Sequence, residues 1–181
     1  MERPLLRMFI AYVEDRPGVL NRIASLFRRR AYNIESLTVG RTHREGVSRV
    51  TVVMEANADT ASRIEANLYK LVNVLWVKDI THDSLVERDL ALIKVRANAE
   101  NRAQILQLCE VFRARAVDVS PETLILEMAG ADEKVDSLLE VLRPFGILEA
   151  VRSGTIAMTR GSDVPELMPS AAPATTSQDA A

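Results

Sequence analysis

The sequence predicts an α+β protein in which the element order βαββαβ occurs twice. Its 181 residues are enough for two small domains. Runs with apolar residues at alternate positions, typical of strands, are interspersed with runs whose apolar residues recur at three- and four-residue steps, typical of helices. The order of these runs over residues 5–83 is repeated over residues 88–160, which indicates two similar domains in succession.

The first half opens with an apolar strand at residues 5–13 and continues with an amphipathic helix at residues 18–30. The apolar face of this helix is expected to comprise Val19, Leu20, Ile23, Ala24, Leu26 and Phe27. Two strands joined by a turn at Glu45-Gly46 come next, and then a second helix that Asp59 or Thr60 caps. The remaining strands of this half are expected at residues 32–42, 47–56 and 74–83.

The second half has the same order of elements. Its hairpin turns at Pro121-Glu122, Pro144 ends its second helix, and Ser153-Gly154 breaks its last strand. Strands are expected at residues 88–97, 116–120, 123–130 and 147–160, and helices at residues 100–115 and 132–143. Each half is therefore expected to be a ferredoxin-like domain, with an antiparallel four-stranded sheet and two helices on one face.

The predicted domains are residues 1–83 and 84–160. Residues 161–181 are rich in Ala, Pro, Ser and Thr without periodicity, so a disordered tail is expected there. One face of each sheet should carry no helix. In residues 47–56 neither face is cleanly polar, and a half-apolar open face or sheet edge favours association with a second copy. The sequence therefore predicts a homodimer.

Composition excludes several classes of protein. The net charge of −2 provides no overall attraction to nucleic acid or to an anionic membrane surface. No apolar run approaches the roughly 18 residues that span a bilayer, and no signal peptide is evident. The basic run at residues 27–32 fits a helix C-terminus, and the strand at 47–56 lacks the aromatic residues on which RNA-binding modules stack bases. Cys109, the single cysteine, is expected to be a small buried hydrophobe in a cytoplasmic protein.

Catalytic and metal-binding motifs are absent from the sequence. His43 and His82 are isolated, and there is no HExxH, CxxC, GxSxG, GxGxxG or phosphate-loop pattern. The carboxylates are scattered over expected helix exteriors. The sequence therefore predicts a chain without an active site, a metal or a cofactor of its own.

The stretch "EDRPGVLNRI" at residues 14–23 contains the elements of a small-anion site. Pro17 suits the entry to a helix, and Gly18 lets a ligand approach the backbone, where the first N–H groups of the helix have no intrahelical partner. An amino-acid carboxylate fits these donors. Asp15 and Asn33 are candidates to hold its ammonium group, and an apolar wall is expected from Val19, Leu20 and Ile34. A plain strand-to-helix turn remains the alternative.

These residues belong to a longer pattern that resembles the ACT domain of the small, regulatory subunit of acetolactate synthase, also called acetohydroxyacid synthase. The resemblance rests on "DRPGVLNRIASLFRRRAYNIESLTVG" at residues 15–40, of which "YNIESLTVG" is the most specific part. It continues in "LYKLV" at 68–72, "VER" at 86–88 and "AVRSGTIAMTRG" at 150–161. A D-x-P-G-x-L pattern alone would indicate only an ACT domain.

The resemblance covers residues 5 to 161 and implies a fold and a function. It implies an N-terminal ACT domain, a second ferredoxin-like domain and no catalysis in this chain. The implied partner is a large catalytic subunit, which is expected to hold thiamine diphosphate, Mg and FAD. This chain is expected to activate that subunit and to make it subject to feedback inhibition by valine, and in some members by leucine or isoleucine. The implied effector site lies between two ACT domains. Gly18, Val19 and Leu20 supply the turn, and Asp15, Asn33 and Ile34 complete the site, the last two from a partner chain. Some relatives have Asn in place of Asp15.

Two other functions remain open on the sequence alone. One is a stand-alone ACT amino-acid sensor that serves a different partner. The other is a ferredoxin-fold hydrolase of the acylphosphatase type, for which Arg16 and Asn33 would be the catalytic pair. The turn at Pro17-Gly18 offers a shorter phosphate cradle than such enzymes use.

Overall fold

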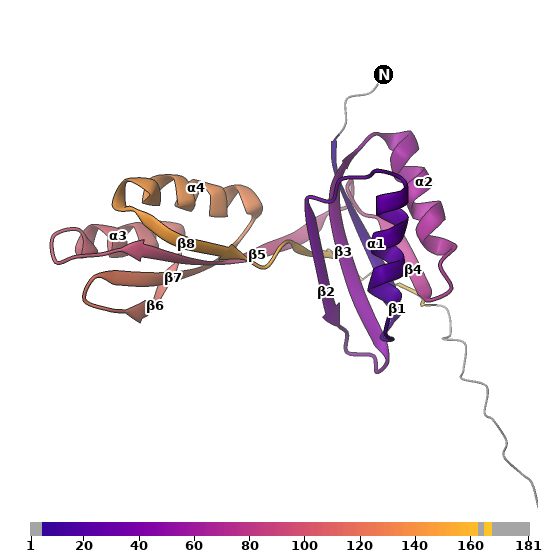
Figure 1. The fold of residues 1–181 in the computed structure, drawn as a ribbon, viewed down its shortest axis with the longest axis horizontal. Coiled ribbons are helices and arrows are strands. Elements are labelled where there is room, and N and C mark those ends of the chain that lie inside the picture. The colour runs from indigo at the N-terminus through magenta and orange to yellow at the C-terminus, as the bar shows by residue number, and fades with distance from the viewer. Residues whose placement is uncertain (1–4, 163–164, 168–181) are drawn as a thin grey trace, which may run out of the picture.

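A computed structural model describes residues 5–162 and 165–167. The predicted tail lies largely outside these residues. The chain forms two ferredoxin-like domains joined by long strands (Figure 1). In chain order the elements are β1 (Leu5–Glu14), α1 (Val19–Arg29), β2 (Ser36–Arg41), β3 (Val47–Ala56), α2 (Ala58–Tyr69), β4 (Val74–Asp79), β5 (Leu85–Arg96), α3 (Arg102–Phe112), β6 (Arg115–Val119), β7 (Thr123–Gly130), α4 (Asp132–Leu142), the 3-10 helix η1 (Arg143–Phe145), β8 (Ile147–Arg152) and β9 (Ile156–Thr159).

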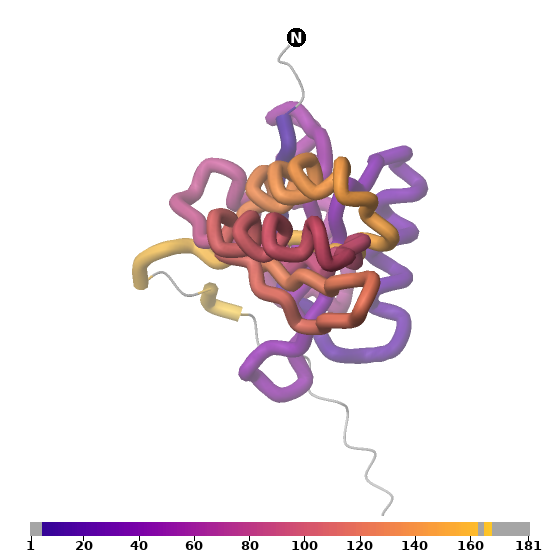
Figure 2. Tube along the Cα trace, turned by 90° about the vertical axis from the view of Figure 1, so that its left-hand side faces the viewer, coloured from indigo at the N-terminus to yellow at the C-terminus, as the bar shows by residue number. Residues whose placement is uncertain are grey.

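Both sheets have the topology that the repeated element order predicts. The N-terminal sheet has the strand order β2-β3-β1-β4 and the C-terminal sheet the order β6-β7-β5-β8, with all neighbours antiparallel. In each domain the two helices lie together on one face of the sheet (Figure 1). Figure 2, which looks along the long axis, shows α3 and α4 side by side in front of the N-terminal domain. The predicted fold class is confirmed.

Each domain has its own hydrophobic core between sheet and helices. The first centres on Phe9, Phe27, Met54, Ile64 and Leu68, none of which is more than 1% exposed. The second centres on Ile93, Ile105, Leu124, Leu126 and Leu138, all fully buried. Burial of each such side chain contributes about 1.5–3 kcal/mol, so two independent cores stabilise the two halves of the chain.

The structure corrects several local predictions. Leu20 and Ala24 are exposed, because α1 turns this flank away from the sheet. Asn57, and neither Asp59 nor Thr60, caps α2 by accepting a hydrogen bond from the Thr60 amide at 2.9 Å.

Two predicted strands are shorter than expected. The residues before β2 close the end of α1, where the Tyr32 amide donates to the Phe27 carbonyl, so β2 begins at Ser36 rather than at residue 32. β4 ends at Asp79 rather than at residue 83, because the chain turns there and the Asp83 amide donates a hydrogen bond to the Ile80 carbonyl.

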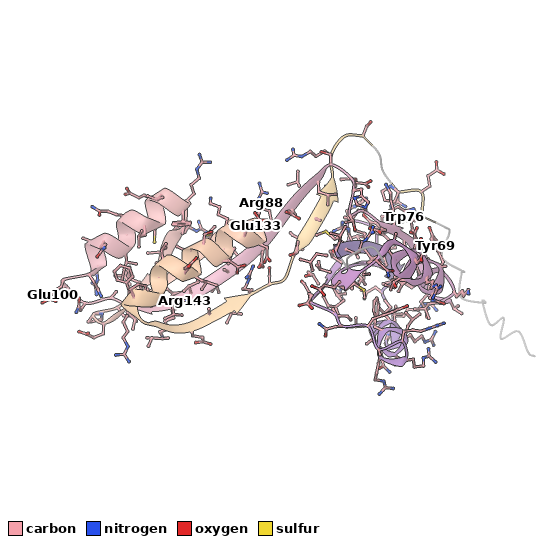
Figure 3. The ribbon with its side chains drawn as sticks, turned by 90° about the horizontal axis from the view of Figure 1, so that it is seen from above. Tyr69, Trp76, Arg88, Glu100, Glu133 and Arg143 are labelled. Carbon is pink, nitrogen blue, oxygen red and sulfur yellow. The ribbon has the colours of Figure 1, made fainter. Side chains whose placement is uncertain are left out.

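The helix-free face of the N-terminal sheet is partly covered by the chain itself. The first residues of β5, Leu85–Arg88, pair with β9, and this two-stranded ribbon crosses between the domains (Figure 3, near the labelled Arg88). Ala157 of β9 packs with Ile10 and Ile80 in a small third cluster. The expected bare face is therefore half occupied by strands that continue into the second sheet. The boundary between residues 83 and 84 stays a prediction.

Candidate functional site

The turn between β1 and α1 holds Gly18 in a conformation that favours glycine. Its φ of 84° is left-handed, and a Cβ added to it would meet no heavy atom within 4 Å. Two backbone hydrogen bonds hold the turn in place. The Arg16 amide donates to the Glu14 carbonyl at 2.9 Å, and the Asp15 amide donates to the Gly46 carbonyl of the β2–β3 hairpin at 2.8 Å. The start of α1 is thus rigidly placed and open on its outer side.

The N-terminus of α1 is free of competing side-chain groups, a feature that it shares with α3. No side chain caps it, and its first turn contains no acidic residue. Within the described part of the chain, the backbone N–H groups of Gly18 and Leu20 have no acceptor. By contrast, Asn57 caps α2 and two acidic residues occupy the first turn of α4. Unpaired N–H groups at a positive helix end suit an anion such as a carboxylate.

A buried polar network beneath this turn was not anticipated from the sequence. Glu14, 6% exposed at the end of β1, accepts a hydrogen bond from Asn73 Nδ2 at 2.7 Å and pairs with Arg16 at 3.2 Å. Arg22 Nη1 on α1 donates to Asn73 Oδ1 at 2.6 Å. The network connects the end of β1, the first turns of α1 and the loop before β4. By the alternation of β1, Glu14 shares a face with Ile10 and Tyr12 rather than with the core residues Phe9, Ala11 and Val13, so the strand pattern gave no sign of this network.

Asp15, which follows β1, has a partner at the end of the edge strand β2. Its carboxylate lies 3.1 Å from Arg41 Nε, and the Arg41 side chain is 87% exposed. An exposed ion pair of this kind stabilises by only about 0–1 kcal/mol, so an incoming ammonium group can replace it. Asp15 therefore lies beside the open helix end, and its ion-pair partner there is the weakly bound guanidinium of Arg41.

Asn33 and Ile34 lie at the other end of the same helix. α1 runs for 11 residues, about 16 Å, away from Gly18 before the chain reaches them. Asn33 is exposed and donates to Glu35 Oε1 at 2.6 Å, and Ile34 packs partly against the core. One chain therefore does not bring Asp15 and Asn33 together. The same separation removes the hydrolase alternative, because Arg16 and Asn33 cannot share one phosphate loop.

The expected apolar wall is also only partly present. Val19 is 5% exposed and belongs to the core, so it cannot line a surface site. Leu20 is 44% exposed beside the turn. On the same free side of the domain, edge strand β2 exposes Leu37 and Val39. Leu20 and the β2 edge form an apolar flank that one chain leaves uncovered.

Strand β2 also touches the C-terminal domain. Gly154, with φ of 80°, sits so close to it that an added Cβ would lie 2.7 Å from Ser36 Oγ and 2.8 Å from Thr38 Oγ1. The Thr155 amide donates to Ser36 Oγ at 3.2 Å. The close approach and the positive φ together favour glycine at this position. The predicted break at Ser153-Gly154 is thus an interdomain contact, which sequence periodicity could not indicate.

No helix of the described residues is long and apolar enough to cross a membrane. The same residues contain no group of three or more His, Cys, Asp or Glu side chains placed to hold a metal ion. Cys109 is buried, and burial raises the pKa of its thiol.

Comparison with known proteins connects these features to one family. Residues 9–76 match the model of the AHAS small subunit-like ACT domain, and residues 88–161 match that of the small subunit of acetolactate synthase. The acetolactate synthase small subunit of Mycolicibacterium smegmatis is 47% identical over 149 residues, which are 82% of this chain and 88% of that protein. A probable acetolactate synthase small subunit of Archaeoglobus fulgidus is 47% identical over 83% of this chain and 94% of its own length.

A solved structure agrees with these matches. The crystal structure of the acetolactate synthase small subunit from Thermotoga maritima superposes with a TM-score of 0.81 at 37% identity, and covers 88% of this chain and 99% of that one. The agreement extends over both domains. The chain belongs to the acetolactate synthase small-subunit family.

Proposed function

We propose that this chain activates the catalytic subunit of acetolactate synthase and makes it subject to feedback inhibition by valine, with leucine and isoleucine as related effectors. The observation that carries the proposal is the uncapped, open N-terminus of α1 at Gly18. The catalytic subunit would hold thiamine diphosphate, Mg and FAD, and the complex would work in the cytoplasm in branched-chain amino-acid synthesis. This chain would bind only the effector.

The effector site would lie between two copies of the chain. Gly18 and Asn33 occupy opposite ends of α1, so two antiparallel α1 helices would place the Gly18 end of one copy against the Asn33 end of the other. The uncovered flank formed by Leu20 and the edge strand β2 supports this arrangement, since pairing would cover both. Each two-fold dimer would then contain two effector sites.

The groups at the N-terminal end of α1 are complementary to an amino acid. The free N–H groups at Gly18 would bind the carboxylate, and Asp15 would bind the ammonium group. A charge-assisted hydrogen bond contributes about 1.5–3 kcal/mol and burial of an isopropyl group about 1.5–2 kcal/mol. After the entropic cost of association, a dissociation constant on the order of 10 μM to 1 mM is expected.

Coupling to the catalytic subunit would pass through β2. This strand has one uncovered edge, and its side chains Ser36 and Thr38 contact Gly154 and Thr155 of the interdomain linker. A ligand that favours one arrangement of paired β2 strands would thereby bias the position of the C-terminal domain. Such regulation requires only that valine binds the two arrangements with different affinity.

The test is a calorimetric titration of valine into the chain assembled with its catalytic subunit, with inhibition measured on the same preparation. Gly18→Asp places a carboxylate where that of the ligand belongs, and we expect loss of binding and feedback resistance with activation retained. Gly161→Asp is the matched control, because Gly161 also has a positive φ and open space but lies outside the site. Unchanged valine inhibition in Gly18→Asp would place the effector elsewhere.

A further inference from the structure

A cavity lies on the helix-free face of the N-terminal sheet, and Gly18 does not line it. It has a volume of about 320 Å³ and lies between strands β2 and β3 and the linker strand β9. Arg49, Thr51 and Gly40 contribute to it from the sheet, and Ile156 and Met158 from β9. Ala157 of β9 packs against Ile10 and Ile80, while Ile156 and Met158 of the same strand border the cavity.

Strand register explains the shape of the cavity. Gly40 lies opposite Arg49, Arg49 opposite Tyr12, and Tyr12 opposite Trp76, so these four residues form one row across the sheet. Gly40 is the only member of the row without a side chain, and a Cβ added to it would meet nothing within 4 Å. The absent side chain leaves a hollow directly beside the Arg49 guanidinium.

The Arg49 guanidinium is incompletely paired. Nη2 donates to the Ala157 carbonyl, and the guanidinium carbon lies 5.9 Å from the centre of the Tyr12 ring. Nε is enclosed by protein and has no hydrogen-bond partner. Among the ion pairs of the described residues none includes Arg49, and burial lowers its pKa. A half-buried cation without a counter-ion is unfavourable, so an anion at its terminal nitrogens would stabilise it.

We propose that this cavity binds a small aliphatic monocarboxylate that has no ammonium group. Its carboxylate would meet the terminal nitrogens of Arg49, and its aliphatic part would cover Ile156 and Met158, which are 51% and 69% exposed. No carboxylate side chain lines the cavity, so the ammonium group of an amino acid would have no anionic partner there. Short 2-oxo and 2-hydroxy acids belong to the class that fits.

The two sites would therefore bind two different classes of ligand, both of which carry a carboxylate. At the start of α1, Asp15 accompanies the free N–H groups and suits an amino acid. The cavity at Arg49 is lined by arginine, imidazole, hydroxyl and apolar side chains and by no carboxylate, which suits a ligand with the same carbon skeleton but without the ammonium group. The proposal does not depend on the effector site, since it rests on Arg49, Gly40 and β9 on the helix-free face of the sheet; Arg41, the partner of Asp15, lies at the border of the cavity.

The chain carries its own reporter for this cavity. Trp76 is the single tryptophan, and its ring lies edge-to-face with Tyr12 at 5.8 Å between centroids. Because Tyr12 is in turn stacked beside Arg49, an anion on the guanidinium should change the fluorescence of Trp76. We would titrate the full chain with isovalerate, which has a branched aliphatic part and a carboxylate but no ammonium group, and compare it with valine.

Three variants locate the binding. Gly40→Val puts a side chain into the hollow at a position where a Cβ meets no heavy atom within 4 Å, and it should abolish the saturable fluorescence change. Arg49→Met should weaken isovalerate binding about tenfold or more. Arg44→Met removes the same charge from the same hairpin without lining the cavity, and should bind as the wild type does. Absence of saturable isovalerate binding to the wild type, or retained binding in Gly40→Val, would overturn the proposal. Equal binding of valine that depends on Arg49 would overturn the assigned ligand class.

Discussion

Arg152 Nε donates a hydrogen bond of 2.6 Å to Asp89 Oδ2, at the point where β5 and β8 leave the C-terminal sheet for the interdomain linker. Asp89 is 2% exposed and also accepts a hydrogen bond from Ser153 Oγ at 3.0 Å. Arg152 meets two further carboxylates, Asp132 and Asp136, from the first turns of α4. Burial lowers the pKa of the Arg152 guanidinium, but the hydrogen bond to Asp89 and the charge of Asp132 outweigh it and leave that pKa raised. The pair joins both strands of the linker to one helix.

The pair of Arg152 with the buried Asp89 should contribute more to the free energy of unfolding than the pair of Arg152 with the exposed Asp136. Asp89→Asn keeps the size of the side chain but removes the charge that faces Arg152, and we expect the free energy of unfolding to fall by about 1–3 kcal/mol. Asp136→Asn removes a pair whose carboxylate is 61% exposed, and should change stability by less than about 1 kcal/mol. Urea unfolding of both variants checks the difference. Equal effects of the two substitutions would show that burial of Asp89 is irrelevant.

Gly154 should resist substitution because of its neighbours on β2. Gly154→Ala would force a Cβ against Ser36 and Thr38 and keep a left-handed backbone, and we expect a loss of about 1–3 kcal/mol in thermal unfolding. Adding Ser36→Ala and Thr38→Ala removes both clashing oxygens and should restore part of the loss. The remaining deficit, about 1 kcal/mol, is backbone strain. A triple variant as unstable as Gly154→Ala would show that the clash with β2 is not the cause.

A mixing experiment can distinguish an effector site between chains from one within a chain. Gly18→Asp and Asn33→Ala should each lose valine binding as pure dimers. When the two are unfolded and refolded together, mixed dimers regain one intact site of two, so about a quarter of the wild-type number of sites should return in calorimetry. Each variant refolded alone provides the control. No recovery in mixtures that contain confirmed mixed dimers would contradict a site shared between copies.

Glu65 should make stability depend on pH in the direction opposite to a typical salt-bridged carboxylate. Burial raises its pKa in the folded state, assisted by the nearby charge of Asp79 and opposed by a backbone hydrogen bond there and by Lys78. Between the unfolded and folded pKa values the native state binds more protons, so this group lowers stability as pH rises above its unfolded pKa of about 4.3. Glu65→Gln should therefore be more stable than the wild type at pH 7, and the difference should disappear below about pH 4. Chemical unfolding at several pH values measures it, and a constant difference across that range would contradict the mechanism.

Much of the fold was predictable because helix and strand periods are local properties. The apolar steps that bury Ile23, Phe27, Ile64 and Leu68 are visible in any window of a dozen residues, and so is the repetition of βαββαβ. The residues that begin and end helices were equally predictable from the local sequence. Pro144 follows the end of α4, and Gly18 begins α1 in a conformation that glycine adopts readily.

The misjudged residues are those whose environment depends on distant parts of the chain. Leu20 and Val19 are adjacent and both apolar, yet one is exposed and the other buried, because the sheet beneath α1 determines which flank of the helix is covered. Glu14 was overlooked because its partner Asn73 is 59 residues away. The sequence contains both residues but no local sign of their contact.

The sequence by itself determined two ferredoxin-like domains, the exposed turn at Gly18 and, through "YNIESLTVG", the family. Tertiary structure alone decided that Gly18 and Asn33 stand at opposite ends of one helix, that Gly154 packs against β2, and that Arg49 borders a hollow opposite Gly40. The physical reason is that periodicity reports contacts within a few residues. Strand register and domain packing join residues as far as 119 positions apart, as Ser36 and Thr155 are, and no short-range pattern specifies them.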